Sequence, residues 1–484
     1  MIEFILNDQD ISTSQPPGTT VLDFVRYHKD LKGTKIGCRE GDCGACTVLV
    51  GELVDGAIRY RSMTSCLMPL VNAAAKHIVT IEGINPADGS LTPVQQAMVD
   101  ESGTQCGFCT VGFVMSLTGF CLEEHGDQQA DSLSQGAISS IDGNICRCTG
   151  YKSIERAACT VSNKLTEGSQ RFVPDYFDEI PKRLGELRSS VPRSKPHDSY
   201  SFVGGGTDVY VQKPDWMTDN ESQPLLFDQT LRGIREAGEY IEIGASVTVT
   251  DLIESSVMRA IFPNLYQHLK LVSSTPIRNM ATLAGNFVNA SPIGDMTVWF
   301  LALDAEIDLC TGPPESEGVT RTLALKDMYL GYKQLAKEPD AYITAIRFRK
   351  PVGDFRFNFE KVCKRTYLDI ATVNTAISLT VKALPGKDWL PPVLSGTGAA
   401  GVDVDHTIID AHVAAGGVAP IPLYLRQTSE FLRGKTVNDE TITAANEIMQ
   451  SEISPISDVR GTEAYKRLLL RQLFRAHFVE TFGV

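Results

Sequence analysis

The sequence predicts a multidomain α+β protein, and three observations support this fold class. First, its 484 residues exceed what a single hydrophobic core usually serves, so three or four packed units are expected. Second, stretches with strand-like alternation and stretches with helical spacing both occur along the chain. Third, eight of the twelve cysteines fall in four tight groups within the first third of the sequence. The first third is therefore expected to differ in chemistry from the rest.

Charge and hydropathy exclude several classes of partner. The formal net charge is -14 and no run of Lys and Arg is present, which argues against nucleic-acid binding. The first residues include Glu3 and Asp8 where a signal peptide would be basic, and the longest apolar run, residues 296–303, is too short to cross a bilayer. We expect a cytoplasmic protein with no membrane partner. Since thiols stay reduced there, metal or redox chemistry explains the cysteines better than disulfides do.

Residues 1–86 are predicted to form a small β-grasp, ferredoxin-like domain. Residues 1–7 alternate like a strand, and residues 19–28 have a threonine cap followed by helical spacing. Three further stretches have strand composition: residues 46–50, 58–63 and 77–83.

The cysteines of this domain follow the spacing C-x4-C-x2-C with a distant fourth cysteine, which is the plant-type [2Fe-2S] pattern. Glycines at 37, 41 and 44 allow the loop to take positive φ and to bring backbone N–H groups near the sulfurs. A zinc site would more often show two C-x2-C pairs. The predicted ligands of this first cluster are Cys38, Cys43, Cys46 and Cys66.

Residues 87–165 are predicted to form a four-helix domain. Thr92, Pro93 and Gln95 form a capping box with proline at the first helical position, and residues 152–165 have an apolar face at helical spacing. Its cysteines, spaced C-x2-C and then C-x-C, suit either zinc or a second cluster. A second [2Fe-2S] cluster is favoured beside a ferredoxin loop, because electrons need closely spaced centres. Its predicted ligands are Cys106, Cys109, Cys146 and Cys148.

Residues 166–195 are predicted to be a linker, since "SSVPRSKPHD" is rich in Ser, Pro and charge. A new α+β domain over residues 196–352 is expected to follow. In it, "YSFVGGGTDVYV" places three glycines after a short apolar strand, and such turns can direct N–H groups at a diphosphate. An ordinary tight turn is the alternative. Residues 274–296 lack helical or strand periodicity and are predicted to be a loop around a ligand.

Other patterns receive no function. The four isolated cysteines suit small buried hydrophobic positions, and the eight histidines are scattered. Residues 396–401, "GTGAAG", match the G-x-G-x-x-G dinucleotide pattern, but the β-branched, acidic stretch that follows does not begin a helix. A loop between strands is predicted there.

Taken together, these motifs resemble the molybdenum hydroxylase (xanthine oxidase) family. A plant-type [2Fe-2S] loop followed by "QCGFCTVGF" and "NICRCTGY" carries the resemblance over residues 1–164, and "VGGGTD" with "AGN" and "SPIGD" resembles the family's flavin domain. Residues 353–484 resemble the C-terminal α+β subdomain of that flavoprotein. The resemblance implies FAD bound by Phe202, Val203, Gly204, Gly205, Gly206, Thr207, Asp208, Val209, Val272, Thr282, Gly285, Asn286, Asp295, Ile343 and Lys361.

The resemblance also implies an activity. Family members continue from the flavin domain into a large molybdenum-cofactor domain, and the sequence stops before it, so we expect that domain on a partner subunit, in a dimer of heterodimers. Electrons from oxidation of hypoxanthine or xanthine to urate would pass through the two clusters to FAD and then to NAD+. Three alternatives remain open: a related hydroxylase of an aldehyde or N-heterocycle, a molybdenum-independent NAD(P)H:acceptor reductase, and a zinc-binding scaffold.

Overall fold

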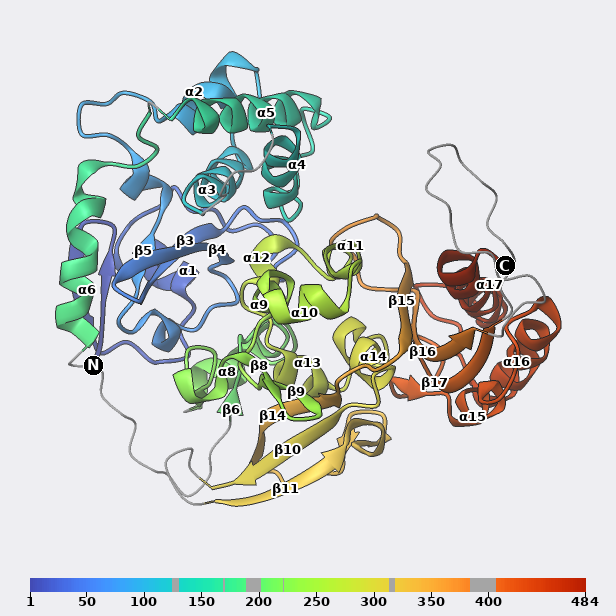
Figure 1. Ribbon diagram of the computed structural model, residues 1–484. Coiled ribbons are helices and arrows are strands. Elements are labelled where there is room, and N and C mark those ends of the chain that lie inside the picture. Colours follow the sequence, from blue (N-terminus) through green and yellow to red (C-terminus); the bar gives the residue numbers. More distant parts are fainter. Residues whose placement is uncertain (124–129, 169, 189–201, 221, 313–317, 384–405) are drawn as a thin grey trace. The chain divides into compact units, whose positions relative to one another are not determined.

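The computed structural model describes residues 1–123, 130–168, 170–188, 202–220, 222–312, 318–383 and 406–484 (Figure 1). The chain divides into two compact units. The first comprises Met1–Leu231, Ser246–Leu252 and Ser273–Gly285, and the second comprises Arg232–Ala245, Ile253–Val272 and Asn286–Val484. The predicted multidomain α+β architecture is confirmed. The predicted "GTGAAG" loop lies outside the described residues.

The first unit begins with a five-stranded mixed sheet in the order β2-β1-β5-β3-β4. Its strands are β1 (Ile2–Leu6), β2 (Gln9–Thr13), β3 (Thr47–Val54), β4 (Ala57–Thr64) and β5 (His77–Val79). The β1–β5 pair is parallel and the other pairs are antiparallel. A short helix, α1 (Val21–Asp23), capped by Thr20 and continued by a π turn, packs its apolar side into the same core as β1 and β3. This is the predicted β-grasp arrangement.

Four helices follow the sheet: α2 (Pro93–Asp100), α3 (Thr110–Cys121), α4 (Ala130–Ser140) and α5 (Lys152–Glu167). The predicted capping box is present at the start of α2, where the Thr92 hydroxyl accepts from Gln95 N at 3.3 Å and the Gln95 side chain accepts from Thr92 N at 2.9 Å. The helix α3 is buried along nearly its whole length, because its sequence is apolar on every side. The four-helix prediction is therefore confirmed.

Residues 166–195 were predicted to be a linker, but where the structure describes them they are partly helical. They contain α6 (Ile180–Arg188), whose Ile180 and Leu184 pack on Ile5 of the first sheet. Arg183 of α6 also contacts Asp8 at 2.7 Å and Asp10 at 2.8 Å. The apolar residues of this segment are few, but they stand at helical spacing and cover part of one face of the sheet.

The remaining elements of the first unit are short. They are the parallel strands β6 (Phe202–Val203) and β7 (Gln223–Pro224) and the helices α7 (Val209–Gln212), α8 (Pro214–Asp219) and α12 (Thr275–Arg278). Two further short helices, α9 (Val249–Glu254) and α13 (Leu283–Asn289), have residues in both units. The loop predicted over residues 274–296 is thus wrong in part. Helices of one or two turns are too short to show a periodic pattern in the sequence.

The second unit contains two antiparallel sheets. The first, in the order β11-β10-β14-β9-β8, consists of β8 (Ile234–Ala237), β9 (Tyr240–Gly244), β10 (Glu306–Thr311), β11 (Val319–Ala324) and β14 (Ala341–Arg349). The helices α10 (Ser256–Ile261), α11 (Leu265–Lys270) and α14 (Asp295–Leu301) and the small pair β12 (Tyr329–Gly331) and β13 (Gln334–Leu335) belong to the same unit.

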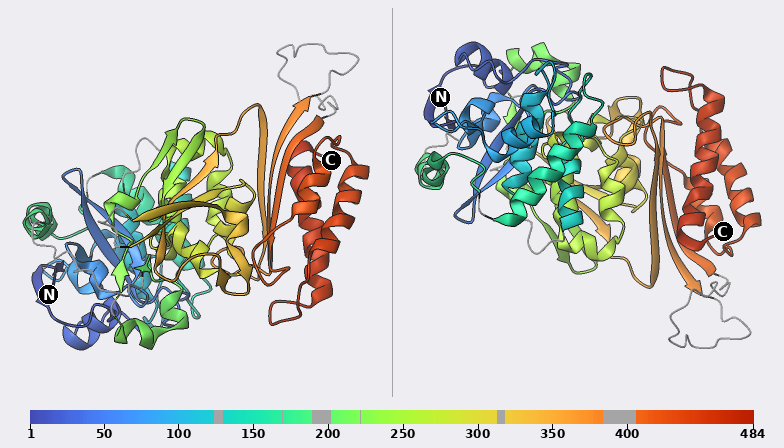
Figure 2. Two further views of the ribbon diagram at one scale, coloured as in Figure 1. Left: turned by 90° about the horizontal axis from the view of Figure 1, so that it is seen from below. Right: turned by 90° about the horizontal axis from the view of Figure 1, so that it is seen from above.

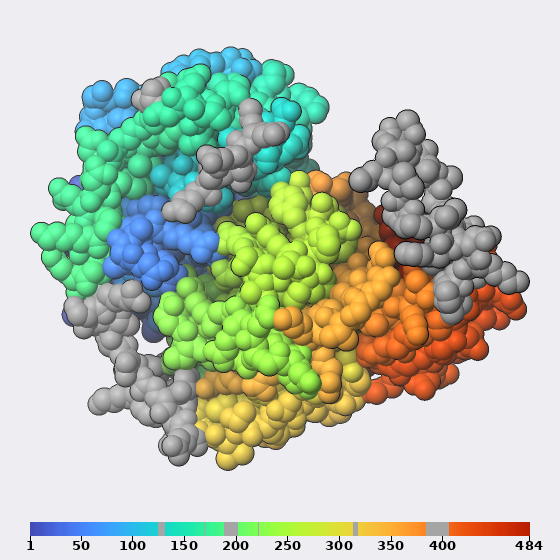
Figure 3. Space-filling view, viewed as in Figure 1, coloured from blue at the N-terminus to red at the C-terminus, as the bar shows by residue number. Residues whose placement is uncertain are grey.

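The second sheet has the order β15-β16-β17-β18, with β15 (Asp354–Val362), β16 (Val373–Ala383), β17 (His406–Gly416) and β18 (Leu423–Tyr424). The helices α15 (Arg426–Leu432), α16 (Asp439–Glu452) and α17 (Glu463–Phe482) cover one of its faces, as Figure 2 shows. Together they bury one apolar core. In the space-filling view, the residues of this C-terminal part form a continuous orange and red region of the surface (Figure 3).

Candidate metal centres and cofactor site

The structure brings the first four predicted cysteines together as two pairs. Three of them lie on the loop before β3, and Cys66 follows β4. The Cys43 thiol donates a hydrogen bond to Cys38, and the Cys66 thiol donates one to Cys46. The bond from Cys43, with backbone N–H donors such as Glu40 at 3.3 Å, lowers the pKa of Cys38 to about 5. A thiolate is the form that binds metal, so the loop favours ligation at this sulfur.

Glycine is required at two positions of this loop. A Cβ built on Gly37 would lie 2.5 Å from Cys43 Sγ, so any side chain there would displace a predicted ligand. Gly44 has a φ of +66°, and its Cβ would lie 2.4 Å from the carbonyl oxygen of Gly143. The two glycines keep the loop tight around its sulfurs and close to the four-helix domain.

The second set of cysteines also forms two pairs. Cys148 Sγ lies 3.6 Å from Cys106 Sγ, and Cys109 donates a hydrogen bond to Cys146. Cys109 stands directly before α3, and the other pair members lie on the loops that flank α3 and α5. Burial raises the pKa of Cys109 to about 12, whereas the backbone N–H of Phe108 lowers the pKa of the exposed Cys106. The set is therefore open to solvent on one side.

This pairing bears on the kind of metal that each set could hold. Within the described ranges, no three His, Cys, Asp or Glu side chains are arranged around a single ion. Structural zinc needs four ligands around one ion. A [2Fe-2S] cluster, in contrast, needs four thiolates shared between two irons. Two separate pairs in each set fit the two-iron arrangement.

The glycine turn of the first unit runs from Gly204 to Asp208, between β6 and α7. Among the described residues, the N–H groups of Gly205, Gly206 and Thr207 donate no hydrogen bond, and Gly206 has a φ of +80°. Consecutive N–H groups in a turn with a left-handed residue form an anion-binding concavity. A Cβ on Gly205 would lie 1.9 Å from the Met280 carbonyl oxygen, so glycine is needed here for close packing as well.

The predicted site residues that follow lie near this turn within the same unit. A Cβ on Gly204 would lie 2.4 Å from Thr282 Oγ1. The same hydroxyl accepts from Gly285 N at 3.1 Å. Residues 282–285 thus support the turn, and Phe202 and Val203 form the strand that leads into it.

In the second unit, two other predicted site residues form a buried ion pair. Lys361 of β15 has a fully buried side chain and donates to Asp295 Oδ2 and to the Leu271 carbonyl oxygen, each at 2.7 Å. Asn374 of β16 donates to the other carboxylate oxygen, Oδ1, at 2.5 Å. Asn286 accepts from Thr297 N at 3.1 Å and so fixes the first turn of α14. The positive charge of Lys361 is thus balanced by the negative charge of Asp295.

The last two predicted residues of this set are apolar. Val272 and Ile343 are both buried, Val272 at the end of α11 and Ile343 in β14 opposite Leu309. The sequence-based prediction missed Asn374. No signal marked it, since Asn374 is one of five polar residues in β16.

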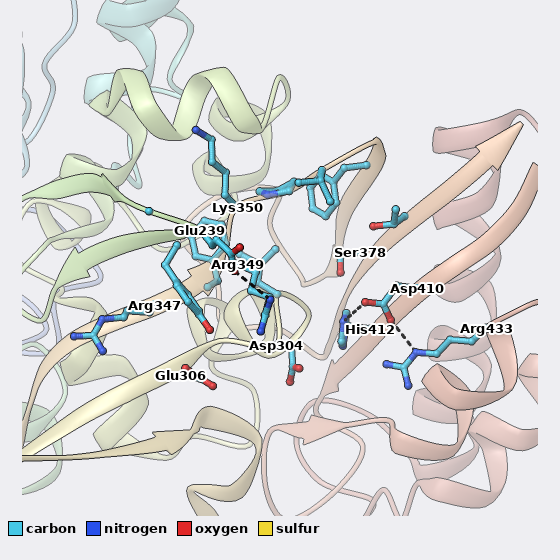
Figure 4. Close-up of a pocket in the computed structure, with 18 residues that line it drawn as sticks. Glu239, Asp304, Glu306, Arg347, Arg349, Lys350, Ser378, Asp410, His412 and Arg433 are labelled. Atoms are coloured by element: carbon cyan, nitrogen blue, oxygen red, sulfur yellow. Dashed lines mark hydrogen bonds and ion pairs between the residues drawn. The ribbon is translucent and has the colours of Figure 1, made fainter.

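A cavity of about 740 Å³ in the second unit contains none of the predicted site residues. Its lining includes Asp410, His412 and Arg433, and Figure 4 shows Asp410 between the other two side chains. His412 Nε2 lies 3.2 Å from Asp410 and Arg433 Nε lies 2.8 Å from it, which lowers the pKa of Asp410. Asp410 thus has a hydrogen-bonding partner on each side.

The chain matches four family models, which together account for most of its length. Residues 4–71 match the 2Fe-2S iron-sulfur cluster binding domain and residues 80–159 the [2Fe-2S] binding domain. Residues 179–350 match the FAD binding domain in molybdopterin dehydrogenase, and residues 359–481 match the CO dehydrogenase flavoprotein C-terminal domain.

Similar proteins include xanthine dehydrogenases of Blastobotrys adeninivorans and Emericella nidulans. The first is 26% identical over 98% of this chain and 40% of its own length, and the second is 28% identical over 90% and 35%. The chain thus spans about two fifths of the curated relatives it matches. A solved Cu,Mo-CO dehydrogenase chain is 28% identical over 58% of this chain and 88% of its own, with a TM-score of 0.47. In the part of the chain that the structure describes, no helix is long and apolar enough to cross a membrane.

Proposed function

We infer that the chain, which belongs to the molybdenum hydroxylase family by its two 2Fe-2S domains, its FAD-binding domain and its C-terminal flavoprotein domain, is the electron-transfer subunit of a xanthine dehydrogenase. The observation that carries the proposal is the presence of two cysteine quartets, each formed of two pairs, in one compact unit. The named relatives motivate the choice of xanthine as substrate.

The two quartets are proposed to hold one [2Fe-2S] cluster each. In the first, Cys38 and Cys43 would bind one iron and Cys46 and Cys66 the other. In the second, the pairs would be Cys106 with Cys148 and Cys109 with Cys146. Backbone N–H groups of Cys148 and Thr149, each 3.4 Å from Cys146 Sγ, would stabilise that sulfur as a thiolate.

Two groups of residues are proposed to contact FAD. In the first unit, the N–H groups of Gly205, Gly206 and Thr207, which donate to none of the described residues, would bind the diphosphate. The resemblance also names Lys361 and Asp295 of the second unit as flavin contacts, and this stays a prediction for that unit by itself. Bound clusters exchange single electrons, and bound flavin exchanges single electrons or a hydride.

The proposal includes a molybdenum cofactor on a large partner subunit and NAD+ as the electron acceptor. In this proposal, oxidation of hypoxanthine or xanthine takes place on that partner. The role of this chain is to hold the redox groups, to keep water from the buried sulfurs such as those of Cys46 and Cys66, and to deliver electrons to the acceptor. A cytoplasmic location stays a prediction.

Gly205→Val is expected to lower FAD occupancy while it leaves the iron content unchanged. The first atom of the valine side chain would lie 1.9 Å from the Met280 carbonyl oxygen, so the turn must shift and its N–H groups would no longer converge. Absorbance of released flavin and iron analysis on the same sample measure the two quantities. Gly185→Ala in α6 is the matched control, because its φ is not in the left-handed region and a Cβ added there would meet only Leu53 Cδ2, at 4.0 Å. Full FAD occupancy in Gly205→Val would contradict the assigned diphosphate site.

Purification of the chain with and without its partner tests the whole proposal. The chain alone should contain about four irons and about four acid-labile sulfides, from the composition of two [2Fe-2S] clusters, together with FAD. It should oxidise NADH with an artificial dye but leave xanthine unchanged, and xanthine oxidation should appear only with the molybdenum subunit. Zinc in place of iron would refute the cluster assignment. Urate formation by the chain alone would refute the division between two subunits, and a preference for an aldehyde or N-heterocycle would refute the substrate.

A further inference from the structure

The loop that carries Cys146 is attached on both sides to other parts of the first unit. On one side it reaches the loop of the first cysteine quartet: Ile145 N donates to the Cys43 carbonyl oxygen at 3.0 Å, and Asn144 Nδ2 donates to the Gly44 carbonyl oxygen at 3.1 Å. The Asn144 side chain is itself held by Ser116 of α3 at 2.8 Å. A main-chain hydrogen bond therefore joins the residue before one predicted ligand to another predicted ligand.

On its other side the same loop is bound to α12 by a buried ion pair. Asp142 Oδ2 accepts from Arg278 at 2.7 Å, and Asp142 Oδ1 accepts from Thr275 N at 2.8 Å. Only 6% of the Arg278 side chain and 4% of the Asp142 side chain are exposed. Arg278 also donates to the Ser273 carbonyl oxygen at 2.8 Å. The pair thus has partners for both carboxylate oxygens and for more than one guanidinium nitrogen.

The segment that carries Arg278 is anchored to the first quartet's domain as well. Asn279 Nδ2 donates to the Ser62 carbonyl oxygen of β4 at 2.8 Å, and β4 leads directly to Cys66. Ile277 of α12 lies against Gly41, whose Cβ would approach Ile277 Cδ1 to 2.7 Å. Residues 273–280 therefore bind both cysteine-bearing loops at once.

We propose that Asp142 and Arg278 are positioning residues that fix the spacing between the two iron-sulfur clusters. The inference rests on the proposed function, since it assumes that both quartets are loaded. Without the ion pair, the loop of Cys146 keeps its bonds to the first quartet's loop, but its attachment to α12 through Asp142 is reduced to the hydrogen bond from Thr275 N. An unpaired buried charge would draw water or move toward solvent, and the loop would move with it.

The test is an EPR measurement on fully reduced protein that contains both clusters. Two paramagnetic centres split each other's lines by an amount that falls with the cube of their separation, so the splitting reports spacing rather than activity. Arg278→Met is expected to lose the splitting seen in the unaltered chain while it retains the iron content. Arg278→Lys, which keeps the positive charge, should retain part of the splitting.

Arg61→Met is the matched control. Arg61 also pairs with an aspartate, Asp251, at 2.7 Å, but this pair joins β4 to α9 and includes no residue of a cysteine-bearing loop, so its replacement should leave the splitting intact. If Arg278→Met does not retain iron, the splitting is measured in Asp142→Asn instead. This variant keeps the side-chain oxygen that accepts from Thr275 N and removes only the negative charge. An unchanged splitting in iron-loaded Arg278→Met or Asp142→Asn, or an equal loss in Arg61→Met, overturns the inference. Failure of the unaltered chain to hold two clusters would instead overturn the proposed function.

Discussion

Cys148→Ala lowers the iron content of the purified chain from about four atoms to about two, because one four-thiolate site can no longer hold its [2Fe-2S] cluster. The effect should be confined to the second quartet, since the Cys148 thiol is exposed and pairs with Cys106 of the same quartet. In the complex with the molybdenum subunit, xanthine should no longer reduce the flavin, whereas NADH should still do so. Iron analysis, EPR and stopped-flow absorbance measure these three results.

Cys159→Ala is the control for this variant. Cys159 lies in α5 of the same four-helix domain, is partly buried, and belongs to neither quartet. Its replacement should leave the iron content and both reduction reactions unchanged. If a folded Cys148→Ala chain kept all its iron, the assignment of the second quartet would be wrong. Equal loss of xanthine-driven and NADH-driven flavin reduction would contradict the assigned order of the redox groups.

Lys361→Met is expected to destabilise the protein by about 3–5 kcal/mol, the usual cost of removing one partner from a buried ion pair. The Lys361 side chain is fully buried and the Asp295 side chain is only 11% exposed, so among the described residues the remaining carboxylate would keep only Asn374 as a side-chain donor. FAD occupancy should fall together with stability. Urea unfolding followed by circular dichroism measures the first effect and flavin absorbance the second.

Two further variants separate the charge effect from the loss of a lysine. Lys350 pairs with Glu236 at the surface, where 43% and 53% of the two side chains are exposed, so Lys350→Met should cost less than about 1 kcal/mol. The double variant Lys361→Met with Asp295→Asn buries no charge and should recover much of the stability lost in Lys361→Met. A Lys361→Met chain as stable as Lys350→Met would show that the pair contributes nothing to the second unit.

The features that the sequence predicted best are local. The cysteine spacings, the Thr92 capping box and the helices around it depend on residues a few positions apart, so their patterns are visible without the fold. The β-grasp sheet was recognisable because four of its strands have apolar alternation. The edge strand β2 was missed, since its five residues include only one buried side chain.

The features that escaped prediction depend on residues distant in sequence. Asp142 and Arg278 are 136 positions apart, and nothing near either residue marks it as half of a buried pair. Asn374 meets Asp295 only after β16 pairs with its neighbours. The cavity beside Asp410 and His412 likewise arises from strands of two different sheets. Such sites follow from packing, which no short pattern encodes.

The route of the chain through its two units bears on how the protein is made. Residues 246–252 belong to the first unit, yet they are synthesised after segment 232–245 of the second, and residues 273–285 of the first unit follow segment 253–272 of the second. A ribosome-bound chain therefore cannot complete its N-terminal unit when residue 231 emerges. Domains usually fold as units during synthesis, N-terminal first. Here the bridge between Thr248 and Thr282 and the contact of Arg278 with Asp142 must wait until about 50 more residues have left the exit tunnel, so both cysteine-bearing loops emerge before the segment that supports them.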